Sequence, residues 1–362
     1  MKKTLIALAV LGAAAGVAHA QSNVTIYGIV DTGFIKETGK DVKMGENVNN
    51  RIGFRGVEDL GSGQKATFEL ERRFELADGT QKGVDWDGAA NVGLKGDNWG
   101  AVRLGRINEI TTEYVRRLDP FYQYGVGSMV LSTQRSARIS DTVRYDSLNW
   151  NGFHFAASYS LGRDKDDYLY KDTTPSFDND GYAVGLMYDN GPVMLQGNWS
   201  RVADSNDSYS WNLGGWYKFG PARVSLAYEQ TRDKGAKHGM LSSEEIAGKI
   251  GSAKGIESKQ QNWLLGLQWA LGPGKLNASF NYAKVDDVSV ASFAGGGAYA
   301  GWNGGSKDLK KYAIGYTYDL SKRTSIYGVV AYNDFEDEQI ANFYGYDDDS
   351  VTGVQVGITH KF

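Results

Sequence analysis

The sequence predicts an all-β fold, a 16-stranded antiparallel transmembrane β-barrel. Two observations along the 362 residues predict it: stretches of roughly ten residues alternate apolar and polar side chains, and the links between them are alternately short and long. Because successive side chains of a strand point to opposite sides, this alternation makes one face apolar and the other polar. One stretch places five apolar residues on a single face: Trp263, Leu265, Leu267, Trp269 and Leu271.

A soluble sandwich would bury the apolar faces between two sheets, whereas a barrel in lipid turns them outward and keeps a polar lumen. The composition favours the barrel, because 47 Gly, 22 Tyr and 9 Trp accompany a mean hydropathy of −0.42. Such values are expected when half of each strand lines water. No stretch beyond the N-terminus approaches the roughly 20 apolar residues of a membrane-spanning helix.

The strands follow one another in order, each ending where alternation stops and turn residues begin. We place them at residues 24–37, 50–60, 63–76, 89–97, 100–108, 137–147, 152–162, 180–190, 192–202, 208–219, 222–233, 260–271, 275–287, 308–320, 324–336 and 350–362. Tight turns with Gly, Asn or Pro follow the even strands. Longer links follow the odd strands, at 38–49, 77–88, 109–136, 163–179, 234–259, 288–307 and 337–349, with one short link at 203–207. This asymmetry is typical of periplasmic and external ends.

Residues 1–20 have the pattern of a cleavable secretory signal: a charged start at Lys2 and Lys3, an apolar run, and small residues up to Ala20. Cleavage after Ala20 would leave a single barrel domain, 21–362, and change the formal net charge from −4 to −6. So acidic a chain disfavours nucleic acid as a partner. The absence of Cys excludes a disulfide framework, thiol catalysis and Cys-type zinc sites.

Several short segments are specific to one family. They are Val24 to Asp31, Asn50 to Gly56, Leu104-Gly105-Arg106, Val143 to Ser147 and the terminal His360-Lys361-Phe362. In these segments the chain resembles Gram-negative general porins of the neisserial and β-proteobacterial type. The resemblance implies an outer-membrane homotrimer, a terminal Phe read by the assembly machinery, and a loop folded into the barrel after the fifth strand. Porins usually have an aromatic residue where His360 stands.

The longest link, residues 109–136, is expected to be this constriction loop. A link of 28 residues without a strand of its own suggests a function. It carries Glu113 and Asp119, and its Asp119-Pro120-Phe121 resembles the acidic Pro/Phe tip that faces the pore in such porins. The alternative is a solvated external loop of mixed charge.

Arginines occupy lumen-facing positions on the strands near this loop. Ile52 and Val143 take the lipid side, so the arginines that alternate with them face inward. On this basis we place four inside: Arg51, Arg55, Arg138 and Arg144.

Alternation is less regular in residues 100–108. Leu104 points outward, which sends Arg103 inward but Arg106 toward lipid. A guanidinium at the bilayer midplane costs about 2–4 kcal/mol, so we expect a bulge or strand end at Gly105 that returns Arg106 to the lumen. The family resemblance also places Arg106 in the lumen. Strict alternation does not settle the side of Arg73 either, and we assign it to the lumen.

An arginine ladder opposite a loop with carboxylates would create a field across a narrow water column, which turns zwitterions and holds anions in passing. The predicted function is therefore an outer-membrane porin, a water-filled channel for passive diffusion of small hydrophilic solutes and ions that leans toward anions. The expected constriction residues are Arg51, Arg106, Arg138, Arg144, Glu113 and Asp119, with Arg55, Arg73 and Arg103 extending the ladder. Alternatively, these arginines only neutralise nearby carboxylates.

Catalysis is not expected. The four histidines lie on separate segments, and no Ser and Asp stand near them at the spacing of a catalytic triad. They are His19, His154, His238 and His360. We predict no enzyme activity, no cofactor and no metal, since the acidic runs lack calcium-loop spacing. The expected partners are two further copies of the chain, outer-membrane lipid and lipopolysaccharide, and solutes in transit.

The alternative function is a surface adhesin or binding barrel that displays loops 163–179, 234–259 and 288–307. Ion conductance distinguishes the two, because an adhesin whose constriction loop plugs the barrel would be electrically silent.

Overall fold

The computed structural model describes residues 23–130, 138–162, 179–203, 207–234, 254–292 and 305–362. The predicted signal segment 1–20, residues 131–136 of the constriction loop, and most of loops 163–179, 234–259 and 288–307 lie outside these ranges. Within the described ranges no helix is long and apolar enough to cross a membrane.

The described strands form one antiparallel ring. Sixteen long strands make up this part of the chain: β1 (Asn23–Glu37), β3 (Arg51–Gly61), β4 (Gln64–Arg73), β5 (Ala89–Gly96), β6 (Gly100–Asn108), β7 (Arg138–Asp146), β8 (Phe153–Ser160), β9 (Gly181–Asn190), β10 (Val193–Arg201), β11 (Tyr209–Phe219), β12 (Ala222–Lys234), β13 (Lys254–Leu271), β14 (Gly274–Ser292), β15 (Lys307–Asp319), β16 (Thr324–Phe335) and β17 (Ser350–Lys361). Each pairs with the next, and β1 pairs with both β3 and β17. The predicted 16-stranded antiparallel barrel is confirmed.

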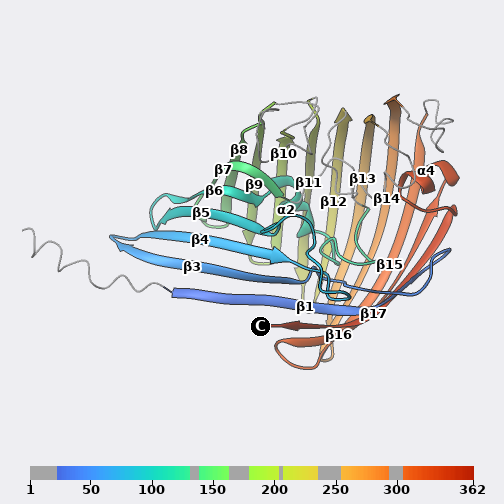
Figure 1. Cartoon of the computed structure of the whole chain (residues 1–362), viewed down its shortest axis with the longest axis horizontal. Helices are drawn as coiled ribbons and strands as arrows, with labels where there is room; N and C mark the ends of the chain where they lie inside the picture. Colours follow the sequence, from blue (N-terminus) through green and yellow to red (C-terminus); the bar gives the residue numbers. More distant parts are fainter. Residues whose placement is uncertain (1–22, 131–137, 163–178, 204–206, 235–253, 293–304) are drawn as a thin grey trace, which may run out of the picture.

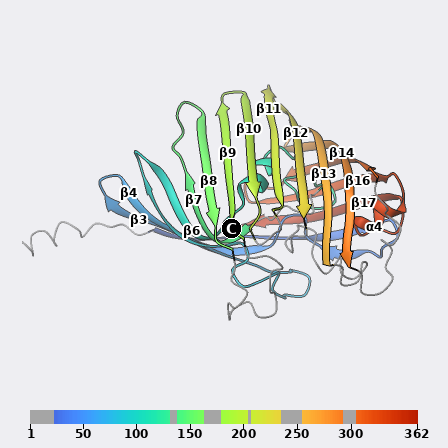
Figure 2. The same cartoon turned by 90° about the horizontal axis from the view of Figure 1, so that it is seen from above.

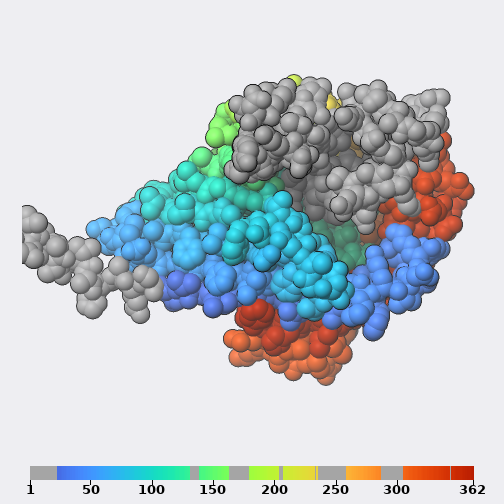
Figure 3. All heavy atoms as spheres, viewed as in Figure 1, coloured from blue at the N-terminus to red at the C-terminus, as the bar shows by residue number. Residues whose placement is uncertain are grey.

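The ring closes where the first and the last strand of the chain meet. The N–H of Gly28 donates to the carbonyl of Phe362 at 3.0 Å, and the N–H of Phe362 donates to the carbonyl of Gly28 at 3.1 Å. Figure 1 shows β1 in blue beside β17 in red, and Figure 3 shows blue and red surfaces in contact along this side. In Figure 2 the strands curve around an interior space.

Two predicted loops are partly strand. β13 begins at Lys254 and β14 extends to Ser292, although residues 234–259 and 288–307 were expected to be links. The backbone pairing continues there, as between Glu257 and Ser289. Backbone hydrogen bonds do not require alternating apolar side chains. Both strands are therefore longer than the stretch in which apolar and polar residues alternate.

Three short elements lie in the long links. β2 (Lys43–Gly45) pairs with β1, α2 (Ile110–Arg116) begins the constriction loop, and α4 (Glu338–Phe343) lies between β16 and β17. Asp337 caps α4 by accepting the N–H groups of Gln339 and Ile340. None of the three was predicted, because each is too short to establish a period.

Burial in the barrel is the reverse of that in a soluble protein. Outward Leu213 and Leu226 are each 61% exposed, whereas inward Asn212 and Ser225 are 1% and 2% exposed. Contiguous exposed apolar surface needs a partner, and hydrocarbon is the partner that a closed barrel meets on all sides. Lipid outside and polar groups inside therefore explain the pattern.

The predicted irregularity at Gly105 is present. The pairing of β6 with β7 shifts between Gly105 and Ile107, and Gly105 has a φ of +124°. A Cβ at this position would lie 2.2 Å from the carbonyl oxygen of Ala90. Only glycine fits this bulge, which redirects the side chain of Arg106.

Gly105→Ala should therefore destabilise the barrel by about 1–3 kcal/mol, because a strained backbone and a steric clash coincide. The measurement is the temperature at which the folded barrel unfolds in SDS electrophoresis. Gly328→Ala in β16 is the control, since its added Cβ would have no neighbour nearer than 3.9 Å. Equal unfolding temperatures for the two variants would contradict the requirement for glycine.

Candidate functional site: the lumen constriction

The constriction loop begins by packing on the inner wall. Ile110, Tyr114 and Val115 of α2 are buried in an apolar cluster with Met187 of β9 and Met194 of β10. Glu109 caps the helix by accepting the N–H of Thr112 at 2.7 Å. Figure 1 shows the teal segment that contains α2 in front of β9 to β11. The predicted inward fold is confirmed.

Past the helix, polar side chains of the wall hold the loop backbone. The Ser225 hydroxyl donates to the carbonyl of Leu118 at 2.6 Å, and the Gln268 amide donates to the carbonyl of Pro120 at 2.8 Å. Further along the loop, the N–H of Val126 donates to the side chain of Gln355 in β17 at 3.1 Å. The loop therefore follows the inner wall from α2, beside β9 and β10, as far as β17.

Asp119 does not have the predicted role of a pore-facing carboxylate. It is 0% exposed and accepts the backbone N–H groups of Phe121, Gln123 and Met129 at 3.0, 2.7 and 2.9 Å. Burial raises the pKa of Asp119, against the opposing effect of these hydrogen bonds. The expectation is corrected: this carboxylate ties the loop to itself, a local folding that strand alternation cannot reveal.

Three wall arginines surround one buried carboxylate. Glu71 of β4 is 6% exposed, and its oxygens lie 3.7 Å from Arg51 Nη1, 3.5 Å from Arg73 Nε and 4.0 Å from Arg138 Nη2. Arg51 and Arg73 are direct neighbours in the register of β3 and β4. Strand pairing thus brings together two arginines whose mutual repulsion Glu71 offsets.

Arg106 joins this group through a second carboxylate. Its Nη2 lies 2.5 Å from Asp87 Oδ1, and Nη1 donates to the Ser140 hydroxyl at 3.0 Å. The other oxygen of Asp87 is 3.9 Å from Arg73 Nη1. The structure therefore places Arg51, Arg73, Arg106 and Arg138, which we call the arginine cluster, on one side of the lumen.

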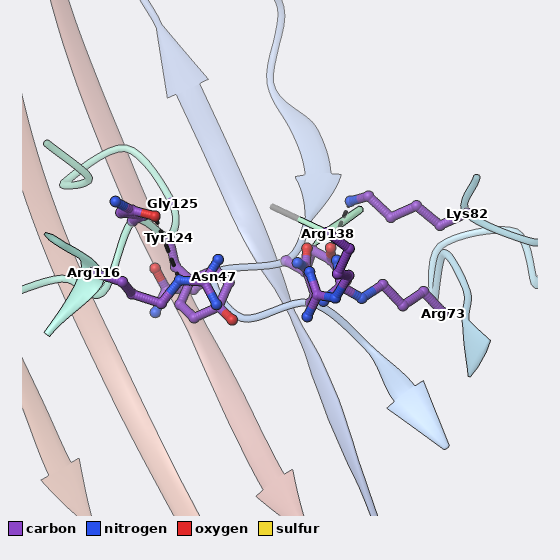
Figure 4. Close-up of a pocket in the computed structure, with 10 residues that line it drawn as sticks. Asn47, Arg73, Lys82, Arg116, Tyr124, Gly125 and Arg138 are labelled. Atoms are coloured by element: carbon purple, nitrogen blue, oxygen red, sulfur yellow. Dashed lines mark hydrogen bonds and ion pairs between the residues drawn. The ribbon is translucent and has the colours of Figure 1, made fainter. Parts of the chain in front are cut away.

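A cavity of about 270 Å³ lies between the cluster and the constriction loop. Four cations, Arg73, Arg138, Lys82 and Arg116, and one carboxylate, Glu46, are among its lining residues. In Figure 4, Arg73, Arg138 and Lys82 lie on one side, and Arg116 and Tyr124 approach from the other.

The cavity also contains an ion pair from external links. Lys82 Nζ lies 2.6 Å from Glu46 Oε1. Burial lowers the pKa of Lys82, but Glu46 and Glu75 outweigh it, so the pKa is raised and the ammonium stays charged. On the loop side the hydroxyl of Tyr124 accepts from Arg51 Nη2 at 3.4 Å.

Arg144 and Arg103 belong to a separate, more neutral group. Arg144 is 2% exposed, with Nη1 2.8 Å from Glu113 Oε2 and Nη2 2.7 Å from Asp146 Oδ1. Arg103 lies 2.7 Å from the other oxygen of Asp146. Burial raises the pKa of Glu113, but the charge and hydrogen bond of Arg144 outweigh burial. The pKa of Glu113 is therefore lowered, and the carboxylate stays ionised. Here the arginines neutralise carboxylates and anchor α2.

Arg55 lies apart from both groups. It is exposed, and its guanidinium lies 5.3 Å from the ring centre of Tyr27. With Arg103 and Glu69 it lines a second cavity of about 360 Å³. Arg55 and Arg103 thus continue the basic wall away from the arginine cluster.

Several residues of the site were not predicted. Glu71 alternates with Arg73 and could have been found from the strand pattern. Glu46, Lys82 and Asp87 come from links between strands, where no periodicity indicates which side chains turn inward. Arg116 and Tyr124 depend on the course of the constriction loop.

A closed barrel with an apolar exterior, a polar lumen and an internal loop defines a transmembrane channel of the porin class. The family model for Gram-negative porins matches residues 7–338, and the chain belongs to this family. It is a protein of the Gram-negative outer membrane, in a family of channels rather than enzymes.

Two relatives align over their whole length and the whole of this chain. They are an outer membrane porin protein of Bordetella pertussis, 31% identical, and outer membrane porin protein 32 of Delftia acidovorans, 32% identical. Among solved structures, the anion-selective porin from Comamonas acidovorans superposes with a TM-score of 0.70 at 26% identity, covering 94% of this chain and 100% of that one.

Asp119→Ala should loosen the constriction loop, because it orphans three N–H donors and each buried unsatisfied group costs about 1–3 kcal/mol. We expect noisier single-channel currents with a higher mean conductance. Asp319→Ala, at an exposed end of β15, is the control and should behave like the wild type. Quiet currents of wild-type size from Asp119→Ala would contradict the anchoring role.

Proposed function

We propose that this porin is a passive diffusion channel that prefers small anions, and that the arginine cluster sets the preference. The observation that carries the proposal is the cavity beside the constriction loop, where four cationic side chains face one carboxylate. The anion selectivity of the Comamonas porin supports it.

The mechanism combines sieving with electrostatic orientation. Guanidiniums remain charged at physiological pH, and a narrow water column between protein walls screens them poorly. An anion in the cavity is attracted by Arg73, Arg138 and Arg116 together, whereas a cation finds only Glu46, already paired with Lys82. Because each contact is weak and exchangeable with water, the anion can leave again, as conduction requires.

The formal charge, −4 for the whole chain and −6 without residues 1–20, does not oppose this preference. Charges act within about a Debye length of 8–10 Å, so external carboxylates influence the mouth while the cluster governs the narrowest part. We assign Arg144 and Glu113 a structural role there, since each neutralises the other.

Arg73→Gln should lower the anion preference, and Arg72→Gln should not. The two neighbours point to opposite sides of β4: Arg73 has a side chain 7% exposed beside Glu71, whereas Arg72 is 47% exposed beside Asp85. Under a tenfold KCl gradient across a planar bilayer, we expect the Cl⁻/K⁺ permeability ratio of Arg73→Gln to fall about twofold from loss of one cavity charge. Wild-type cation preference, or equal ratios in both variants, would contradict the proposal.

We also propose that the channel is a homotrimer contacting outer-membrane lipid and lipopolysaccharide, and that residues 1–20 direct its export before 21–362 folds. Membership of the porin family and the exposed apolar exterior support this assembly. Mass measurement of the detergent-solubilised complex should give three copies, and a monomeric mass would refute the trimer. A purely adhesive barrel is not favoured, because the family is one of channels.

A further inference from the structure

Three basic side chains lie on the wall opposite the arginine cluster. Lys218 is the last residue but one of β11, and Arg223 and Lys275 are the second residues of β12 and β14, so each lies next to a tight turn, β11 to β12 or β13 to β14. Lys218 and Arg223 are paired in the register of β11 and β12. Lys275 is far from the other two in sequence, but all three lie along one end of one wall.

These side chains face the lumen. Leu226 of β12 points outward and Ser225, which holds the constriction loop, points inward. Arg223 lies two residues before Ser225 and therefore also points inward. A side-chain nitrogen of Arg223 donates to Gln268, the residue that binds the carbonyl of Pro120. In the strand register Arg223 is paired with Gln268 and Lys275 with Ala270, so Arg223 lies at the turn-side edge of the loop and Lys275 lies nearer the turns.

The positive charge of this group is uncompensated. Among the described residues, no carboxylate forms an ion pair with Lys218, Arg223 or Lys275. Instead Arg223 and Lys218 stand over Trp216, 4.5 and 5.7 Å from its ring centre. This contrasts with Arg144, which two carboxylates neutralise.

Tyr122 of the constriction loop lies beside this basic group. Its side chain is 38% exposed, and Arg223, Lys275 and Gln268 are the neighbours that influence its hydroxyl. Burial raises the pKa of Tyr122, but the charges of Arg223 and Lys275 outweigh burial and lower it.

We propose that Lys218, Arg223 and Lys275, with Tyr122 above them, form a second anion station on the turn side of the constriction. Small anions that leave the arginine cluster pass next along this opposite wall. With cationic groups on both walls, the lumen attracts anions before and after the constriction. The arginine cluster alone would leave the opposite wall without positive charge.

This inference rests on the proposed diffusion function and adds residues to it. The test is the double variant Arg223→Gln/Lys275→Gln, with Lys322→Gln/Arg323→Gln as the matched control. The control also removes one Lys and one Arg, but from the exposed turn between β15 and β16. Folding of both variants is checked by heat-modifiable mobility in SDS electrophoresis, and only folded channels are recorded.

The readout is the Cl⁻/K⁺ permeability ratio from reversal potentials in a tenfold KCl gradient, at several mean salt concentrations. We expect the double variant to lose about twofold of its Cl⁻ preference, increasingly at low salt where screening is weak, while the control keeps the wild-type ratio. Equal ratios in the double variant, the control and an anion-preferring wild type would overturn the second station alone. A wild type without anion preference would overturn the proposed function instead.

Discussion

Closure of the strand ring is the constraint on which the rest of the structure depends. Hydrocarbon offers no partner for backbone N–H and C=O groups, so a sheet in a membrane cannot leave an edge unpaired. The chain meets this requirement at the seam between β1 and β17, where Gly28 and Phe362 exchange backbone hydrogen bonds. Once the ring is closed, alternation has only one outcome: apolar side chains meet lipid and polar ones enclose water.

The polar lumen in turn makes an internal loop possible. A backbone segment inside a barrel needs donors and acceptors, and the wall provides them through Ser225, Gln268, Asn262 and Gln355. Apolar contacts also hold the loop, at α2 and again where Phe121 and Val130 pack on the wall. Between these contacts, the polar side chains that line the lumen bind the loop backbone, so pore size and wall polarity are coupled.

The parts of the molecule governed by period-two alternation could be predicted from sequence, and the others could not. All sixteen long strands were located, and the bulge at Gly105 followed from the cost of placing Arg106 in lipid. Asp119 was misassigned because its partners are backbone amides of its own loop, a geometry independent of residue pattern. Glu46 and Lys82 enter the lumen from links, where the course of the chain, not its composition, decides direction.

The field in the pore depends on how each arginine is paired, not on how many there are. Arg144 and Arg138 both lie on β7, yet Arg144 is enclosed by Glu113 and Asp146, whereas the one carboxylate within 4.0 Å of Arg138 in the described part of the chain is Glu71. A close, buried pair presents almost no charge to a passing ion, whereas a guanidinium that shares one carboxylate with two others retains most of its own. The transported ion therefore responds to the incompletely paired arginines, and the fully paired ones hold the wall and loop that keep the others in place.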